Sequence, residues 1–342
     1  MADSLLKVEN LTTVFDVAGQ RVMAVDDVSF EVRRGETLGL VGESGSGKSV
    51  AAFSVINLVP PPGRVVAGRV WFEGRNLLTL PPHEMRAVRG AGIGFVFQEP
   101  SAALNPVMRV GAQIAEALIV HGLASRRDAR ARAIDLLQAV RIPDPEMRVD
   151  DYPHQLSGGM RQRVMIAAAL ACRPPLVIAD EPTTALDVTV QAETLDLLRR
   201  LKHEFDVSLL LITHDLGVIA ETADRVAVMY AGRIVEEGPV RDLFERPLHP
   251  YTQGLLRSIP GAAASTQSRL HAIDGVVPSL ANLPSGCAFA PRCPHRMDVC
   301  TTAMPAIIEI EPGHFGRCYL HQSRRQANAS TAAANEEINA AR

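Results

Sequence analysis

The chain of 342 residues is long enough for two domains, or for one domain with a long extension. Hydrophobic residues make up 47% of it, so a large core is available, and a formal net charge of −3 argues against a strongly basic nucleic-acid surface. The sequence has neither an apolar run that could cross a bilayer nor the pattern of a signal peptide, so we expect a cytoplasmic protein that reaches a membrane only through partners.

Two antiparallel strands are predicted at the start of the chain, over residues 5–15 and 22–32, and apolar and β-branched residues alternate along the first. Phe15 closes the first of them. Its ring could stack on a purine base or pack against the sheet, and the residue type alone favours neither.

A phosphate-binding loop follows a short apolar strand predicted over 37–41. Its glycines let the backbone curve around an anion, and the helix predicted over 50–58 adds the positive end of its dipole. Lys48 is expected to reach the terminal phosphates of a nucleotide, and the Ser49 hydroxyl to ligate Mg²⁺. The loop matches the pattern G-x-x-x-x-G-K-[ST], and its predicted nucleotide-binding residues are Gly42, Glu43, Ser44, Gly45, Ser46, Gly47, Lys48 and Ser49.

The next elements are a strand over 65–73, a short helix through Val88 and a strand over 93–97. The glycines of residues 90–94 do not form a dinucleotide-binding turn, because a strand and not a helix follows them. Gln98 ends that strand, at a position where α/β sheets hold ligand-facing groups, although a solvated loop residue is an equal alternative.

Residues 99–156 change from the α/β pattern to an all-helical one, with helices predicted over 110–120 and 125–140. The helix that runs from Leu156 to Cys172 then opens with Ser157 as N-cap and two bare glycines, Gly158 and Gly159. A bare helix N-terminus is a second candidate anion site, and an ordinary cap is the alternative.

An apolar strand over 176–179 is followed directly by Asp180 and Glu181. Paired carboxylates at the end of a buried strand are costly unless they are used. We expect Asp180 to hold Mg²⁺ and Glu181 to accept a proton from an attacking water. His214 ends the strand over 207–213 at the same sheet edge, where it could contact the terminal phosphate.

These motifs, in this order, resemble an ATP-binding-cassette ATPase over residues 5 to about 240. LSGGM at 156–160, HPYTQGLL at 249–256 and CAFAPRCP at 287–294 are similar to the oligopeptide and dipeptide importer branch of that family. The resemblance implies an α/β fold: a P-loop ATPase core with an N-terminal antiparallel β piece, an inserted helical subdomain and a cysteine-rich C-terminal extension. The implied limits are 1–98 and 157–240 for the RecA-like core, 99–156 for the helical subdomain, 241–323 for the extension and 324–342 for a disordered tail.

The resemblance also implies a mechanism. Two cassettes pair head to tail, and ATP lies between Lys48 and Ser49 of one chain and Ser157 and Gly159 of the partner. In that arrangement Phe15 stacks on the adenine, Asp187 lines the dimer seam, and Gln98 senses Mg²⁺ and water. Glu181 is the base and His214 holds the terminal phosphate.

The implied partners are a second and different ATPase subunit, two transmembrane permease subunits and an extracytoplasmic binding protein, at the cytoplasmic face of the inner membrane. Nucleic acid is not an expected partner. Two alternatives stay open at a distance: a same-branch importer of nickel or glycosides, and an ATPase of DNA repair or chromosome structure. The latter needs long heptad arms that this sequence lacks.

Four cysteines gather in a Pro-rich segment near the C-terminus that is expected to have little regular structure. Disulfides are rare in the cytosol, so a metal site is the better interpretation. Well-separated thiolates favour a [4Fe–4S] cluster over Zn²⁺, with His295 or His314 able to replace one ligand, and four reduced thiols are the remaining alternative. The four candidate ligands are Cys287, Cys293, Cys300 and Cys318.

Overall fold

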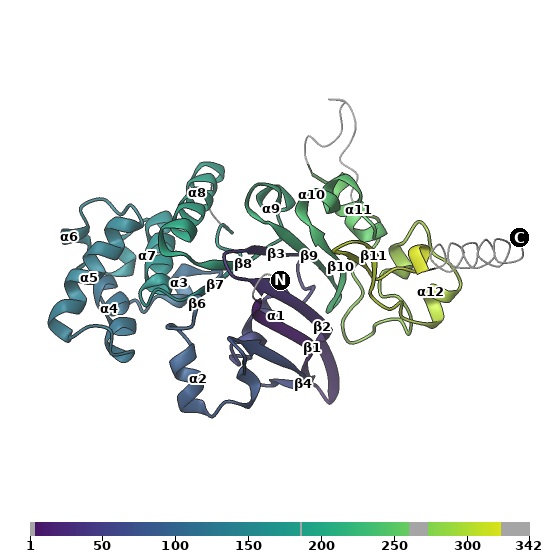
Figure 1. The fold of residues 1–342 in the computed structure, drawn as a ribbon, viewed down its shortest axis with the longest axis horizontal. Helices are drawn as coiled ribbons and strands as arrows, with labels where there is room; N and C mark the ends of the chain where they lie inside the picture. Colours follow the sequence, from purple (N-terminus) through teal and green to yellow (C-terminus); the bar gives the residue numbers. More distant parts are fainter. Residues whose placement is uncertain (1–3, 185–186, 260–272, 323–342) are drawn as a thin grey trace, which may run out of the picture.

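The structure is a computed structural model that describes residues 4–184, 187–259 and 273–322. The tail predicted to be disordered, 324–342, lies outside the described residues. Two sheets, with helices packed between and around them, make up the fold of the described residues (Figure 1).

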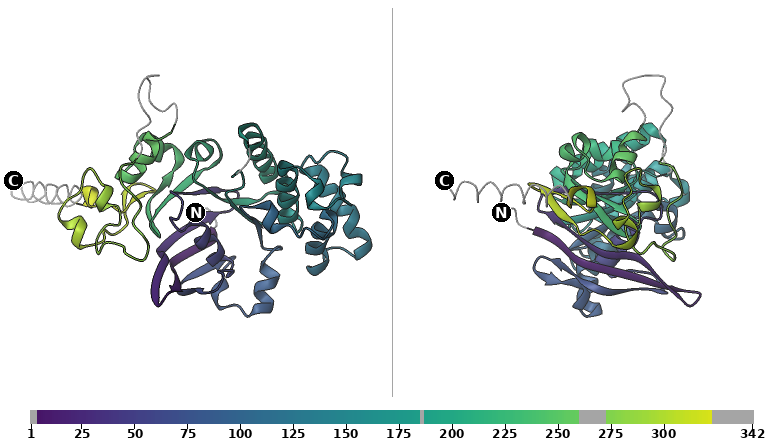
Figure 2. Two further views of the ribbon diagram at one scale, coloured as in Figure 1. Left: turned by 180° about the vertical axis from the view of Figure 1, so that it is seen from behind. Right: turned by 90° about the vertical axis from the view of Figure 1, so that its right-hand side faces the viewer.

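The N-terminal sheet is antiparallel and has the strand order β2-β1-β4-β5. The predicted pair of strands is present, and the chain adds two further strands to it after the phosphate loop. Alternate residues such as Leu6 and Val8 are buried, as expected of a sheet with one face on a core. In side view this sheet forms its own layer beneath the main sheet (Figure 2). Its strands are β1 (Ser4–Val17), β2 (Gln20–Arg33), β4 (Gly63–Phe72) and β5 (Arg75–Asn76).

The main sheet has the order β11-β12-β10-β9-β3-β8-β7-β6, and its central strands are parallel. Every residue of β3, β7 and β8 is buried, which explains why these strands appear in the sequence as continuous apolar runs. Register pairs Val41 with Thr213 and Asp180 with Ile212, so their carboxyl ends share one edge. The parallel strands are β3 (Thr37–Val41), β6 (Ile93–Val96), β7 (Leu176–Asp180), β8 (Ser208–Thr213) and β9 (Arg225–Tyr230).

Helix α1 (Lys48–Val55) lies between the two sheets, and Ala51, Ala52 and Val55 are part of the core that both sheets share. It begins two residues before the predicted start. The last two residues of the phosphate loop therefore form the first turn of the helix, which brings their side chains to the positive end of its dipole.

A group of helices lies beyond the β6 edge of the main sheet (Figure 1). Val110, Ile114 and Leu118 bury one face of α4, and the Ser125 hydroxyl accepts the Asp128 N–H to cap α5. The helices from β5 to the end of this group are α2 (Pro82–Val88), α3 (Pro100–Ala103), α4 (Val110–Val120), α5 (Arg126–Ala139), α6 (Pro145–Arg148) and α7 (Gly158–Leu170), with short 3₁₀ turns at Leu77–Thr79 and Pro153–Gln155. Two more helices, α8 (Val188–Phe205) and α9 (Leu216–Thr222), flank β8 along the chain.

The C-terminal segment has more regular structure than the sequence indicated. Strand β12 pairs with β10, with Gly316 opposite Glu236, so it extends the main sheet, and Tyr251 and Phe289 join the main core. Local composition could not reveal this pairing, because the strand partner lies far earlier in the chain. The elements here are β10 (Arg233–Pro239), α10 (Val240–Glu245), α11 (Pro250–Arg257), a 3₁₀ turn at Ala290–Arg292, α12 (Val299–Thr302), β11 (Ile308–Glu311) and β12 (His314–Gly316).

A buried carboxylate anchors this segment to the sheet. Glu236 is fully buried, and its oxygens accept the backbone N–H groups of Leu248 and His249 and lie 2.9 Å from His314 Nε2. His249 is also buried; it caps α11 by accepting the Tyr251 N–H at Nδ1, and burial lowers the pKa of its ring to about 4.

The low pKa of His249 makes the docking of α11 sensitive to acid. The ordinary value is 6.5, so between that pH and about pH 4 the unfolded chain binds a proton that the folded chain does not. The folded protein therefore loses stability as the pH falls below 6.5, the pKa of this histidine in the unfolded chain. Asn in place of His249 keeps an acceptor for the cap without the titration. Between about pH 7 and pH 4.5, we expect the free energy of unfolding, measured in urea, to fall by about 2–3 kcal/mol less in His249→Asn than in the parent. Equal losses in the two proteins would rule this out.

Candidate active site

The phosphate loop is shaped by close approaches that only glycine allows. A Cβ on Gly47, which has φ 102°, would lie 2.3 Å from the Ala24 carbonyl oxygen, and one on Gly42 would lie 2.1 Å from that of Met229. The Lys48 ammonium donates to the carbonyls of Gly42 at 2.8 Å and Glu43 at 3.1 Å. Its residue is only 4% exposed, and burial lowers the pKa of its amine. The loop thus holds a buried cation within a curve of backbone.

Ser49 and Asp180 form the second part of the site. The Ser49 hydroxyl donates to Asp180 Oδ1 at 3.0 Å, across from α1 to the end of β7. Asp180 is 2% exposed, and burial raises the pKa of its carboxyl to about 6. A hydroxyl and a carboxylate placed together at a helix N-terminus suit Mg²⁺, which takes oxygen ligands and keeps part of its water shell. These donors therefore fit the predicted metal.

Glu181 is the centre of a third cluster, and its φ of 45° is rare for a residue with a side chain. Its Oε2 accepts from Thr184 Oγ1 at 2.7 Å and Gln98 Nε2 at 3.1 Å, and lies 3.3 Å from His214 Nδ1. Burial raises the pKa of this carboxyl, but the bonds from Thr184 and His214 outweigh burial and hold it below the ordinary value. The group is therefore an anion at neutral pH, as a proton acceptor must be. Strained backbone of this kind is typical of functional sites.

The structure thus gathers Gln98, Glu181 and His214, which come from three different strand ends. Sequence reasoning missed Thr184. Its position three residues after Glu181, in a turn closed by its N–H to the Glu181 carbonyl at 3.1 Å, is the signal that could have indicated it.

Other predicted residues lie outside this network. Ser157 caps α7 by accepting the Met160 N–H at 3.3 Å, and it is exposed together with Gly158. Asp187 caps α8 and is exposed. Among the described residues, no hydrogen bond or ion pair joins 157–159 to 42–49. Phe15 is half-buried on β1 with its ring over Gly63.

The predicted metal cluster is not supported. Within the described ranges, no three or more His, Cys, Asp and Glu side chains are arranged to hold a metal ion. Burial raises the pKa of the Cys318 thiol to about 12. His314 is committed to Glu236 and is not free to replace a ligand. The physical reason is that strand pairing with β10 and packing on the main core hold the segment in place.

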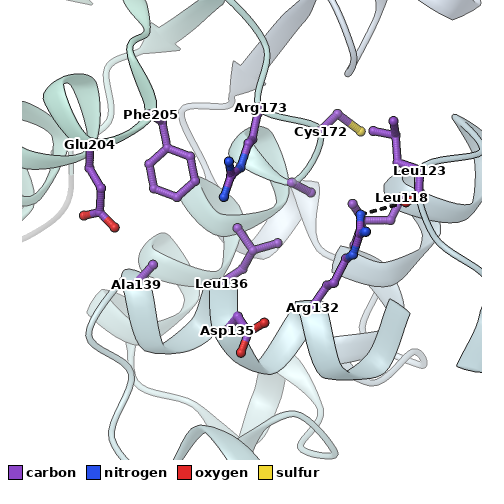
Figure 3. Close-up of a pocket in the computed structure, with 11 residues that line it drawn as sticks. Leu118, Leu123, Arg132, Asp135, Leu136, Ala139, Cys172, Arg173, Glu204 and Phe205 are labelled. Carbon is purple, nitrogen blue, oxygen red and sulfur yellow. Dashed lines mark hydrogen bonds between the residues drawn. The ribbon is translucent and has the colours of Figure 1, made fainter. Parts of the chain in front are cut away.

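A pocket of about 600 Å³ lies elsewhere, between α5, the end of α7 and the end of α8 (Figure 3). The Arg173 guanidinium lies over the Phe205 ring, 5.5 Å from its centroid, and Arg132 donates to the Leu123 carbonyl. Cys172 also lines the pocket; burial raises the pKa of its thiol, which therefore has little thiolate character. None of the predicted site residues lines this pocket. In the part of the chain that the structure describes, no helix is long and apolar enough to span a membrane.

Comparison with known proteins agrees with this geometry. A family model described as ABC transporter matches residues 25–184, and one described as oligopeptide/dipeptide transporter, C-terminal region, matches 235–300. The probable peptide ABC transporter ATP-binding protein y4tR of Sinorhizobium fredii is 54% identical over 319 residues, covering 93% of this chain and 95% of its own. The oligopeptide transport ATP-binding protein OppD of Escherichia coli is 49% identical, covering 93% and 94%.

A solved structure is also similar. The ATP-binding cassette MJ0796, in a dimeric post-hydrolysis state with ADP and Pi, has a TM-score of 0.61 and 30% identity over 69% of this chain and 99% of its own. Matching motifs, fold and relatives over nearly the whole length lead to one assignment: the chain belongs to the ABC transporter family, as an ATP-binding subunit that hydrolyses ATP.

Proposed function

We propose that the chain is the ATP-hydrolysing subunit of a membrane importer for dipeptides or oligopeptides. The observation that carries this proposal is the joint occurrence of the phosphate loop and Glu181 cluster of an ATPase with a C-terminal region that matches oligopeptide and dipeptide transporters at 235–300. Relatives at about half identity over most of the chain are named as peptide import or transport ATP-binding proteins. A same-branch importer of nickel or glycosides is the alternative, since an ATPase site does not indicate the cargo.

The residues of the site divide the work of phosphoryl transfer to water. The loop N–H groups and Lys48 bind the terminal phosphates, while Ser49 and Asp180 hold Mg²⁺, which neutralises phosphate charge when bound. Glu181 accepts the proton of the attacking water, and Gln98 orients that water. His214, exposed at the strand end, contacts the terminal phosphate. Thr184 keeps the Glu181 carboxylate aimed at the water by a 2.7 Å bond.

The exposed N-terminus of α7 completes the ATP site of a second cassette. Ser157 and Gly159 of one chain meet the nucleotide held by the partner subunit's Lys48, and Asp187 lines the seam between them. Phe15 stacks on the adenine. The dimeric state named for the similar solved cassette supports this pairing. The second cassette is a different chain.

A groove beside Gln98 receives the permease. A pocket of about 340 Å³ lies between β6 and the helical group. Leu58 and Phe97, which are 41% and 36% exposed, are among its lining residues. Phe97 directly precedes Gln98 in the chain. A permease segment that packs against Phe97 would therefore lie next to the residue that orients the water. The complex lies at the cytoplasmic face of the inner membrane, with an extracytoplasmic binding protein on the other side.

Affinity purification from detergent-solubilised membranes tests the whole proposal. We expect two permease chains, a second cassette and a binding protein to co-purify, and the ligand of that binding protein identifies the cargo. Leu58→Glu puts a charge into the apolar groove and should reduce recovery of the permease at least tenfold, because burying an unpaired charge is costly.

The matched control is Val66→Glu, at a side chain 47% exposed outside this groove. ATP binding by the purified chain should be the same in both variants. Recovery of soluble partners alone would overturn the transport function, and equal permease recovery with Leu58→Glu would move the docking site elsewhere.

A further inference from the structure

One arginine of the C-terminal segment forms a bidentate ion pair with the phosphate loop. Arg292 Nη1 donates to Glu43 Oε2 at 2.7 Å, and Nη2 donates to Oε1 at 3.1 Å, so the two side chains form a parallel fork across a sequence separation of 249 residues. Glu43 is the second residue of the phosphate loop. Bidentate pairs of this kind are among the stronger and more directional side-chain contacts in proteins.

Contacts with residues other than Glu43 also hold the Arg292 side chain in place. Its side chain is 4% exposed, and Nη2 and Nε also donate to the carbonyls of Ile273 at 3.1 Å and Asp274 at 3.0 Å. Its guanidinium lies 5.9 Å from the ring centroid of Tyr230 and 6.0 Å from that of Phe289. A side chain held by this many partners loses little further freedom when it binds a carboxylate, so it can hold Glu43 in one place.

A second contact from the same segment reaches the loop backbone. The hydroxyl of Tyr251, on α11, accepts the Glu43 N–H at 2.8 Å, and the Tyr251 ring is fully buried against Tyr230 and Phe289. The Glu43 carbonyl in turn accepts from Lys48 Nζ at 3.1 Å. Side chain, N–H and carbonyl of one loop residue therefore connect the C-terminal segment to the phosphate-binding lysine.

The charge of Glu43 gives this contact a functional meaning. A carboxylate within a loop that binds polyphosphate repels its ligand, and Glu43 is 28% exposed, so solvent screens it only in part. Arg292 supplies the compensating positive charge. Without it, the loop would present a bare anion beside the phosphates.

We infer that Arg292 is a positioning residue for ATP binding, through which the C-terminal segment sets the affinity of the phosphate loop for nucleotide. It touches neither nucleotide nor the reacting atoms. It neutralises Glu43 and fixes the loop curve that holds Lys48. This role goes beyond peptide import and does not depend on which cargo the importer carries.

Binding of a fluorescent ATP analogue with Mg²⁺ to the purified full chain tests this, with ATP hydrolysis by its complex with the partner cassette measured in parallel. Arg292→Gln should weaken binding about ten- to thirtyfold at low salt, with a deficit that shrinks as added salt screens the repulsion from Glu43, while kcat at saturating ATP changes little. Arg292→Gln combined with Glu43→Gln should restore most of the affinity, because the uncompensated carboxylate is gone. Arg296→Gln, at an exposed arginine of the same segment, is the control and should match the parent.

Arg292→Lys keeps the charge without the fork and should bind within about threefold of the parent; it also covers the case in which Arg292→Gln folds poorly. Unchanged binding in Arg292→Gln would overturn the inference. So would a double variant as weak as Arg292→Gln, since that result would assign Arg292 a purely structural role.

Discussion

Glu181→Gln is expected to bind ATP as the parent does and to hydrolyse it about 10²–10⁴ times more slowly. The amide has the same shape and can still accept the Thr184 hydroxyl, which lies 2.7 Å from Glu181 Oε2, but it cannot take up a proton. In the parent, the Thr184 and His214 contacts hold the pKa of this carboxyl low, so the base is ready at neutral pH. Removing a proton acceptor therefore affects the chemical step and not the binding step.

Single-turnover hydrolysis and equilibrium ATP binding separate these two steps. We expect Glu181→Gln to accumulate with its partner cassette as an ATP-bound dimer on size-exclusion chromatography, because closure precedes hydrolysis. Glu221→Gln removes a charge from an exposed position on α9 and should behave like the parent. Ordinary turnover by Glu181→Gln would remove this residue from the role of base.

The central part of the site could be predicted because its chemistry follows the fold. The phosphate loop is one contiguous run of residues, and Asp180 and His214 each follow an apolar strand. Once the strands are taken as parallel neighbours, their carboxyl ends must share an edge, as the register of β3, β7 and β8 bears out. Local sequence patterns are sufficient to predict site residues where the strand order brings those residues to one edge of the sheet.

The contacts of the C-terminal segment could not be predicted in this way. Arg292 and Tyr251 have no motif that indicates the phosphate loop, and each meets Glu43 only because the segment extends the main sheet through β12. The four cysteines suggested a metal staple because the sequence shows only an irregular, Pro-rich stretch around them. In the structure, the buried Glu236 and the core around Phe289 hold that stretch in place. Long-range packing of this kind leaves little trace in residue order.

Lys48→Ala is expected to remove ATP binding almost completely, with an affinity loss of a hundredfold or more. Hydrogen bonds to charged groups contribute about 1.5–3 kcal/mol each, and Lys48 can make more than one to the phosphates. In the structure its ammonium donates to two loop carbonyls and the residue is 4% exposed, so it has lost most of its contact with water before ATP arrives. ATP binding therefore does not have to strip a full hydration shell from this ammonium.

The same burial separates the effect on binding from an effect on folding. Because burial already lowers the pKa of the Lys48 amine, its charge adds little to the stability of the nucleotide-free protein. We therefore expect Lys48→Ala to melt within a few degrees of the parent without nucleotide and to lose the rise in melting temperature that Mg-ATP gives the parent. Lys7→Ala removes an exposed lysine that pairs with Glu9 on the surface and should retain that rise in full. Parent-like stabilisation of Lys48→Ala by ATP would show that the phosphates bind elsewhere, and the loop would then have to be reassigned.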